Sequence, residues 1–263
     1  MLIAAAVCPH PPLAVPDATG GFGGVVLPQG GSGGMGPPGR EGASRATGAS
    51  QPGAGELGRL RAACRDAVAV LLAAAPDQLV VTGGAAQTTE YPADAGGSLA
   101  GFAVPFAIGS GSGLPLSLTI GKWLLAGAGT RIPPVAWWGI ASGAAPGECL
   151  RLGEKLAALA PRVALLAMGD GPGRRARGVP GAADPGTDRY DAQVTAALAA
   201  ADPGALAALD PGQDEELFVA GRAAWQVLAG AAAGGAGALA AGLRYAAAPF
   251  EVSYYVATWI RAH

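Results

Sequence analysis

Short apolar runs and one long helical pattern alternate over the first part of the chain. The runs LIAAAV, DQLVVTGG and RVALLAMGDG each predict a buried strand that ends in a turn. Between the first two runs, apolar side chains recur at helical spacing and stop before Pro76; they are Leu57, Leu60, Cys64, Ala67, Val68, Leu71 and Leu72. Strand, loop, helix and strand in this order open a βαβ unit, which predicts a parallel sheet.

The same mixed pattern continues to the end of the sequence. PPVAWWGIAS is β-rich, GECLRLGEKLAALA is helical, and LPLSLTIGKWLLA is expected to begin as a strand and turn helical. AAWQVLAGAAAGGAGALAAGL predicts a packed helix, and APFEVSYYVATWI predicts a closing strand. Further helices are expected at about 188–201, 203–209, 212–220 and 221–231. Because no internal repeat is present, we predict a single α/β domain over 1–263 with a central, largely parallel or mixed sheet flanked by helices.

A low-complexity segment interrupts this pattern at 19–55. It is rich in Gly, Ser and Pro and has almost no apolar periodicity, so it buries too little apolar surface to offset its ordering entropy. We expect a long flexible loop inserted between the first strand and the first helix. It is either a lid over a nearby site or a tolerated expansion without function.

Composition narrows the classes of partner. The chain has 263 residues, 51% of them hydrophobic, which suffices for one sizeable core. A net charge of −2 from 17 basic and 19 acidic residues gives no patch for nucleic acid. Three widely spaced cysteines favour a reducing compartment over a disulfide framework. With no secretory leader or membrane-spanning run expected, we predict a cytoplasmic protein that binds a small molecule and has the option of forming homo-oligomers.

Candidate chemistry lies at the predicted ends of three strands. In open α/β sheets, ligands collect outside the carboxyl ends of parallel strands. The three ends carry AVCPHPP, VTGGAAQTTEYP and AMGDGPGRRARG, and we expect them to converge on one cleft.

His10 is one of only two histidines, and prolines flank it on both sides. It is either a metal ligand or acid/base residue, or a hydrogen-bonded histidine at a strand end without function. Cys8 would share its face if the strand continued, which allows either a Cys/His pair or a buried small hydrophobe.

The turn GDGPGRR suggests a second set of candidates. Backbone N–H groups of a Gly-rich turn can form an anion nest, to which Arg174 and Arg175 could add bidentate contacts. Asp170 is either a metal ligand or base, or a residue that stabilises the turn. Glu90 could bring a carboxylate to the cleft, although an exposed loop acid is the commoner explanation.

Several of these segments together resemble a known family. They are the first strand leading into PHPP, the spacing to LVVTG, RVALLAMGDG, RYDAQVTAALAAADPGALAALD, AGRAAWQVLAG and APFEVSYYVATW. They look like the class III extradiol dioxygenase B-subunit superfamily, in particular an alanine-rich bacterial branch of it. The resemblance covers most of the chain outside 19–55. It implies that family's α/β fold, a non-haem Fe(II) or another divalent metal, and opening of a catechol ring by O₂.

The resemblance also implies a ligand set, which this sequence matches only in part. Family members hold iron with two histidines and a glutamate and use a further histidine as acid/base; His10 stands at the position of the first ligand. No histidine follows LVVTG, where Gln87 and Glu90 are the oxygen ligands on offer. Asp170, Arg174 and Arg175 stand near the position of the acid/base histidine, and Glu251 is available as the carboxylate ligand.

The incomplete set of ligands leads to two alternatives. The first is a divergent or catalytically silent member of the family, and the second is a protein on the same fold that binds a small anion or a protein partner. A dimer in which His263 of a neighbouring copy completes the site is a further alternative.

Overall fold

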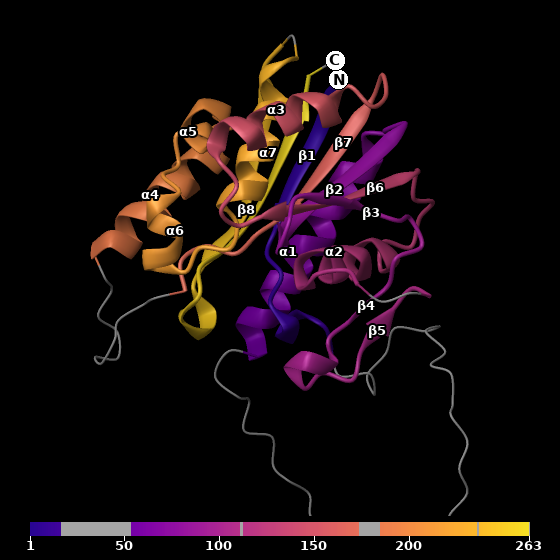
Figure 1. Cartoon of the computed structure of the whole chain (residues 1–263), viewed down its shortest axis with the longest axis vertical. Helices are drawn as coiled ribbons and strands as arrows, with labels where there is room; N and C mark the ends of the chain where they lie inside the picture. The colour runs from indigo at the N-terminus through magenta and orange to yellow at the C-terminus, as the bar shows by residue number, and fades with distance from the viewer. Residues whose placement is uncertain (17–53, 111–112, 174–184, 236, 263) are drawn as a thin grey trace, which may run out of the picture.

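A seven-stranded mixed sheet forms the centre of the computed structural model, which describes residues 1–16, 54–110, 113–173, 185–235 and 237–262 (Figure 1). Its strand order is β3-β6-β2-β7-β1-β9-β8, and β4 and β5 form a small separate sheet. The strands are β1 (Leu2–Cys8), β2 (Gln78–Ala85), β3 (Thr89–Tyr91), β4 (Gly97–Ser98), β5 (Ala107–Ile108), β6 (Val135–Ala141), β7 (Val163–Met168), β8 (Leu239–Ala247) and β9 (Tyr254–Arg261). The architecture confirms the predicted α/β class.

The four inner strands β6, β2, β7 and β1 are parallel, and the outer strands β3, β9 and β8 are antiparallel to their neighbours. Every residue of β1 and β7 is buried, as expected for strands that are covered on both faces. Their continuous apolar runs are therefore the reason why both could be located from the sequence.

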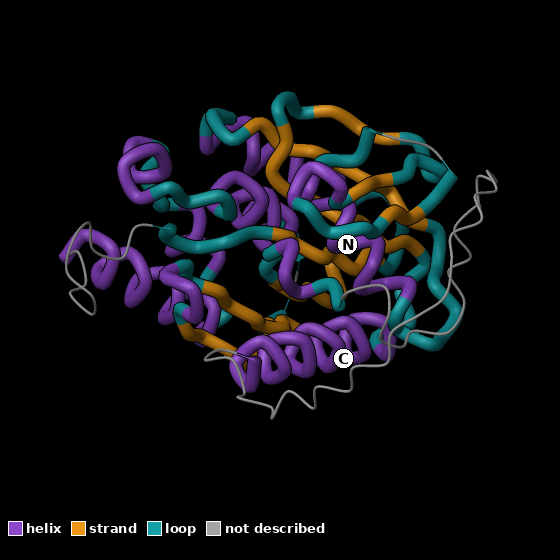
Figure 2. Tube along the Cα trace, turned by 90° about the horizontal axis from the view of Figure 1, so that it is seen from below, coloured by secondary structure: helices purple, strands orange, loops and turns teal. Residues whose placement is uncertain are grey.

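Helices cover both faces of the sheet (Figures 1 and 2). One core forms between the sheet and α1 and α2, and the other between the sheet and α3, α4, α5 and α7. The helices are α1 (Ala54–Ala73), α2 (Leu116–Ala126), α3 (Pro146–Ala157), α4 (Pro185–Ala200), α5 (Pro203–Ala207), α6 (Gly212–Leu217) and α7 (Arg222–Ala233). Short 3₁₀ turns lie at η1 (Pro12–Ala14), η2 (Ala100–Phe102) and η3 (Pro249–Glu251).

Helices α3 and α7 approach each other at two glycines. A Cβ at Gly230 would lie 2.1 Å from the carbonyl oxygen of Leu150, and one at Gly153 would lie 2.0 Å from that of Val227. The two backbones are therefore in direct contact, which fixes the position of α7 against the sheet.

Some local predictions are wrong. The helix expected at 221–231 is present as α7, but the longer stretch predicted as packed helix up to Leu243 is not helical beyond Ala233. Leu239–Ala247 forms edge strand β8 instead, because β9 offers it a complete antiparallel partner. The segment expected to begin as a strand is helical from Leu116, directly after Pro115. Helix α6 ends at Leu217 because Phe218 adopts a left-handed conformation (φ +54°). Apart from the start of α1, the segment 19–55 lies outside the described residues.

Candidate functional site

The ends of β1 and β7 bring His10 and Asp170 together. Cys8 and Met168 are register partners at the ends of these parallel strands, and the Gly169 N–H donates to the Cys8 carbonyl at 2.9 Å. His10 and Asp170 each follow their register partner by two residues, so the pairing of the strands makes them neighbours. This confirms that two of the three predicted strand ends converge.

Asp170 contacts His10 twice. Its Oδ1 accepts the His10 backbone N–H at 2.7 Å and lies 3.5 Å from Nδ1 of the ring. His10 is only 7% exposed, and its Nδ1 is buried without a hydrogen-bond partner in the described part of the chain. At 3.5 Å, Asp170 Oδ1 is too far from Nδ1 to form a good hydrogen bond. The hydrogen bond from the His10 backbone N–H holds the carboxylate in place, and Nδ1 of the ring is left without a partner among the described residues.

The turn from Asp170 to Gly173 is held by backbone hydrogen bonds. The Gly171 N–H donates to the Ser253 carbonyl at 2.8 Å, and the Gly173 N–H donates to the Leu217 carbonyl at 2.9 Å. Pro172 has no N–H to offer, and its carbonyl accepts the Ser253 N–H at 3.0 Å. The predicted anion nest is therefore wrong for these two glycines, because their donors are already used within the fold.

Asp191, which was not among the predicted site residues, helps to hold this turn in place through β9. Asp191 of α4 accepts hydrogen bonds from the hydroxyls of Ser253 (2.9 Å) and Tyr255. Gly171 lies against the Tyr255 ring, where a Cβ would be 2.6 Å from Cε2. Burial, followed by the charge of Asp191, raises the pKa of the Tyr255 phenol well above its ordinary value. The network therefore holds β9 and α4 against the turn that carries Asp170.

Cys8 contacts Cys64 of α1 and is fully buried, which confirms the alternative of a buried small hydrophobe. Both cysteines are buried, and both are free thiols. A side-chain hydrogen bond with Cys8 that favours the protonated Cys64 thiol, followed by burial and the nearby negative charge of Asp170, raises the pKa of that thiol well above its ordinary value. Because the thiolate is the reactive form, Cys64 acts as a core side chain next to the site.

The end of β2 contributes no ligand. The Ser117 hydroxyl of α2 donates to the Gly84 carbonyl at 2.8 Å, and a Cβ at Gly83 would lie 2.5 Å from the same hydroxyl oxygen. Helix α2 thus fills the space into which a side chain at Gly83 would project.

Two other candidates, Glu90 and Glu251, lie at exposed positions. Glu90 is exposed on edge strand β3, four strand positions from β1, which corresponds to about 19 Å. Glu251 is exposed in η3, two residues before Ser253, with a left-handed backbone (φ +60°). Arg174, Arg175 and His263 lie outside the described residues.

The described side chains around His10 test whether the iron centre implied by the family resemblance could be held there. Across the described ranges, no group of three or more His, Cys, Asp or Glu side chains could hold a metal ion. A facial triad needs two imidazoles and a carboxylate around one point. His10 has one carboxylate neighbour, Asp170, which follows the adjacent strand β7. The next strand beyond β7 is β2, and its end is glycine-rich. The described residues therefore do not fit the iron centre that the family resemblance implies.

A small cavity lies next to the segment that carries His10. A cavity of about 10 Å³ lies beside Pro9 and Pro11, against Cys64 and Trp123, which is room for about one water molecule. A far larger cavity, of about 480 Å³, lies at the amino end of β1, away from His10. None of the described helices is both long and apolar enough to cross a membrane.

Comparisons with known proteins add a distant structural likeness. No family model matches the chain, and no curated protein matches it. Among solved structures, it is similar to the crystal structure of the uncharacterized protein JW3007 from Escherichia coli K12. That likeness has 15% identity and a TM-score of 0.35, and it covers 70% of this chain and 86% of the other. It is too remote to support an argument about function.

Proposed function

We propose that this chain is a divergent member of the class III extradiol dioxygenase B-subunit superfamily, silent in ring cleavage, whose His10 and Asp170 bind a small hydroxyl-bearing ligand. The observation that carries the proposal is the buried contact between Asp170 and the His10 ring at the carboxyl end of the parallel strands. Protein sites of this fold class lie at that end of the sheet.

The pair is suited to orient a proton acceptor. A carboxylate beside Nδ1 favours the tautomer that carries its proton there, which leaves Nε2 as an acceptor. A ligand hydroxyl could then donate to Nε2, and a small rotation of the ring would shorten the 3.5 Å contact between Nδ1 and Asp170. His10 is thus the proposed binding residue, and Asp170 is a positioning residue.

The residues that are present support the proposed loss of ring cleavage. The end of β2 carries Gly83 and Gly84 packed against Ser117, and Glu90 is remote from His10. No step of the proposed binding involves a metal ion. We also propose a cytoplasmic location, which the free thiols of Cys8, Cys64 and Cys149 support because they fit a reducing compartment. A homo-oligomer stays a prediction.

The alternative, a site for a small anion or a protein partner, would depend on Arg174 and Arg175. With the N–H groups of Gly171 and Gly173 already engaged, those two side chains would have to supply the recognition. We therefore favour binding at His10.

The test uses the fact that the chain has only two histidines. In NMR spectra, catechol should shift the imidazole signals that disappear in His10→Gln, and Asp170→Asn should weaken binding about tenfold or more. His263→Gln is the matched control and should leave the shift unchanged. Catechol without effect on the His10 signals would refute binding. Anaerobically iron-loaded protein should consume no O₂ with catechol; uptake that depends on His10 would refute catalytic silence.

A further inference from the structure

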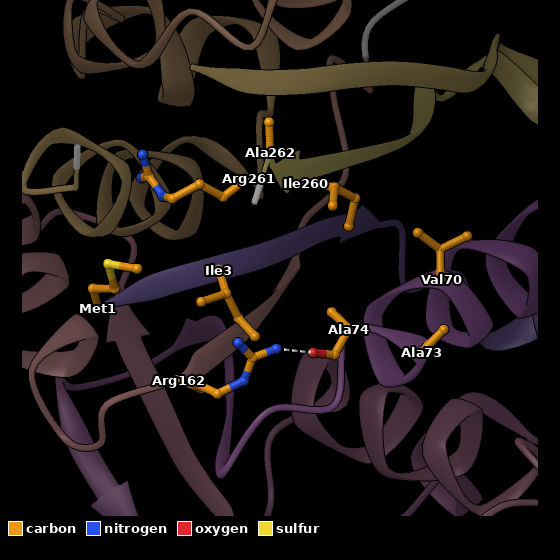
Figure 3. Close-up of a pocket in the computed structure, with 9 residues that line it drawn as sticks. All are labelled: Met1, Ile3, Val70, Ala73, Ala74, Arg162, Ile260, Arg261 and Ala262. Atoms are coloured by element: carbon orange, nitrogen blue, oxygen red, sulfur yellow. Dashed lines mark hydrogen bonds between the residues drawn. The ribbon is translucent and has the colours of Figure 1, made fainter. Parts of the chain in front are cut away.

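The large cavity at the amino end of β1 has the size and lining of a second ligand site, and Figure 3 shows the residues that line it. It measures about 480 Å³, within the range of small-molecule sites. His10 lies roughly 20 Å away, at the other end of the strand. The two sites therefore do not share residues, and this inference is independent of the function proposed for His10.

Aliphatic side chains form most of its wall. Ile3 of β1 and Ile260 of β9 line one side, and Val70 and Ala73 of α1 line the other. Ile3 and Arg162 extend toward one another across this space (Figure 3). Such a wall favours an unbranched hydrocarbon portion of a ligand, because burial of each CH₂ is worth about 0.8 kcal/mol.

Arg162 supplies a fixed positive group in this apolar wall. Its Nη2 donates to the Ala74 carbonyl at 2.6 Å, and its Nε donates to the Ala75 carbonyl at 3.2 Å. Both acceptors lie at the end of α1, so the guanidinium caps that helix. Its Nη1 makes no hydrogen bond to any described residue. The side chain is therefore already held in place, with an edge left to bind an anion at a small cost in entropy.

The charges around the cavity agree with an anion. Arg261 also lines the cavity, but its guanidinium extends away from Ile3 and Val70 (Figure 3) and donates to the carbonyls of Leu2 (2.9 Å), Gly237 (2.6 Å) and Ala232 of α7 (3.5 Å). Arg162 is therefore the charged side chain that faces the cavity. None of the nine lining residues is acidic. The neighbouring carboxylate, Asp77, accepts the backbone N–H of Arg162 at 3.1 Å and lies outside the lining.

We propose that this cavity binds a small amphipathic monocarboxylate, with its carboxylate on Arg162 and its alkyl chain against Ile3, Val70 and Ile260. Arg162 gives the recognition of charge, and the aliphatic wall gives the preference for a hydrocarbon chain. The ligand class is that of a medium-chain carboxylic acid in its ionised form.

The experiment compares octanoate with uncharged 1-octanol by isothermal titration calorimetry. Octanoate should bind wild-type protein at one site, about tenfold or more tightly than octanol. Ala73→Trp fills the cavity from an exposed position of α1 and should weaken octanoate binding about tenfold or more. Ala69→Trp, at an exposed position of the same helix outside the cavity, is the matched control and should change affinity less than about twofold.

A charge variant separates recognition of the carboxylate from apolar binding. Arg162→Gln should abolish the preference for octanoate over octanol, whereas binding of octanol should persist. Absence of saturable octanoate binding to the wild-type chain would overturn the proposal. It would equally fail if Ala73→Trp and Ala69→Trp bound octanoate alike, or if octanol bound as tightly as octanoate.

Discussion

Substitution of Gly83 by alanine tests the packing that closes the end of β2. The new Cβ would lie 2.5 Å from Oγ and 2.6 Å from Cβ of Ser117, and 3.2 Å from Cβ of Met168. Ordinary contact begins near 3.4 Å, so α2 must shift by almost 1 Å relative to the sheet. Overpacking of this kind costs about 1–3 kcal/mol. We therefore expect Gly83→Ala to lower the free energy of unfolding by about that amount.

A double-mutant cycle assigns the cost to one contact. Ser117→Gly removes both clashing atoms, at the expense of the hydrogen bond to Gly84 and of helix propensity, about 1–2 kcal/mol together. The double variant Gly83→Ala/Ser117→Gly should be more stable than the sum of the single effects by about 1–3 kcal/mol.

Urea unfolding followed by circular dichroism measures each variant. Gly84→Ala is the matched control, because its Cβ would meet the Ala220 carbonyl oxygen at an ordinary 3.4 Å, and we expect a change below about 1 kcal/mol. A coupling energy below about 0.5 kcal/mol would refute the reasoning, since an alanine at position 83 would then fit without a clash with Ser117. So would equal losses for Gly83→Ala and Gly84→Ala.

Three further outcomes follow from the burial of particular groups. Because the pKa of the Cys64 thiol is raised, a thiol reagent at about pH 8 should modify it slowly in native protein and fast in denaturant; fast native modification would contradict this. Burial, then the charge of Asp170, raises the Tyr254 pKa above its unfolded value of about 10. The Tyr254 phenol therefore contributes its full stabilisation below about pH 10, and this stabilisation is lost at higher pH. Alkaline unfolding should accompany the rise in phenolate absorbance of Tyr254; ionisation of Tyr254 before unfolding would contradict this. In urea unfolding, Gly230→Ala should destabilise by about 1–3 kcal/mol, whereas Gly58→Ala, with open space around its Cβ, should stabilise by about 0.5–1 kcal/mol; equal effects would contradict the close contact of α3 and α7.

The sequence predicted those parts of the fold whose signals are local. β1 and β7 are buried throughout, so their apolar runs were sufficient evidence. The rule that ligands collect at strand ends then pointed to His10 and Asp170, and the register between Cys8 and Met168 accounts for their contact.

Features that depend on distant partners were missed. β8 is rich in alanine and has a helical composition, and it becomes a strand because β9 pairs with it along its length. The hydrogen bonds of Asp191 to Ser253 and Tyr255 join residues more than 60 positions apart. RYDAQ and SYYV were part of the family resemblance, but nothing in either segment alone predicts that they meet.

Strand β1 relates the two candidate sites in a way that separates their functions. His10 follows its carboxyl end, and Ile3 near its amino end lines the large cavity. Helix α1 contacts both regions: Cys64 lies near the site at His10, and Val70 lines the large cavity. Strand β1, which joins the two regions, is buried along its whole length. Two sites become coupled through a packed element only if that element has two discrete arrangements that both sites bias, and β1 is held by hydrogen bonds to β7 and β9 on its two sides. Binding of a carboxylate at Arg162 and of a hydroxyl at His10 should therefore be independent events on one rigid sheet.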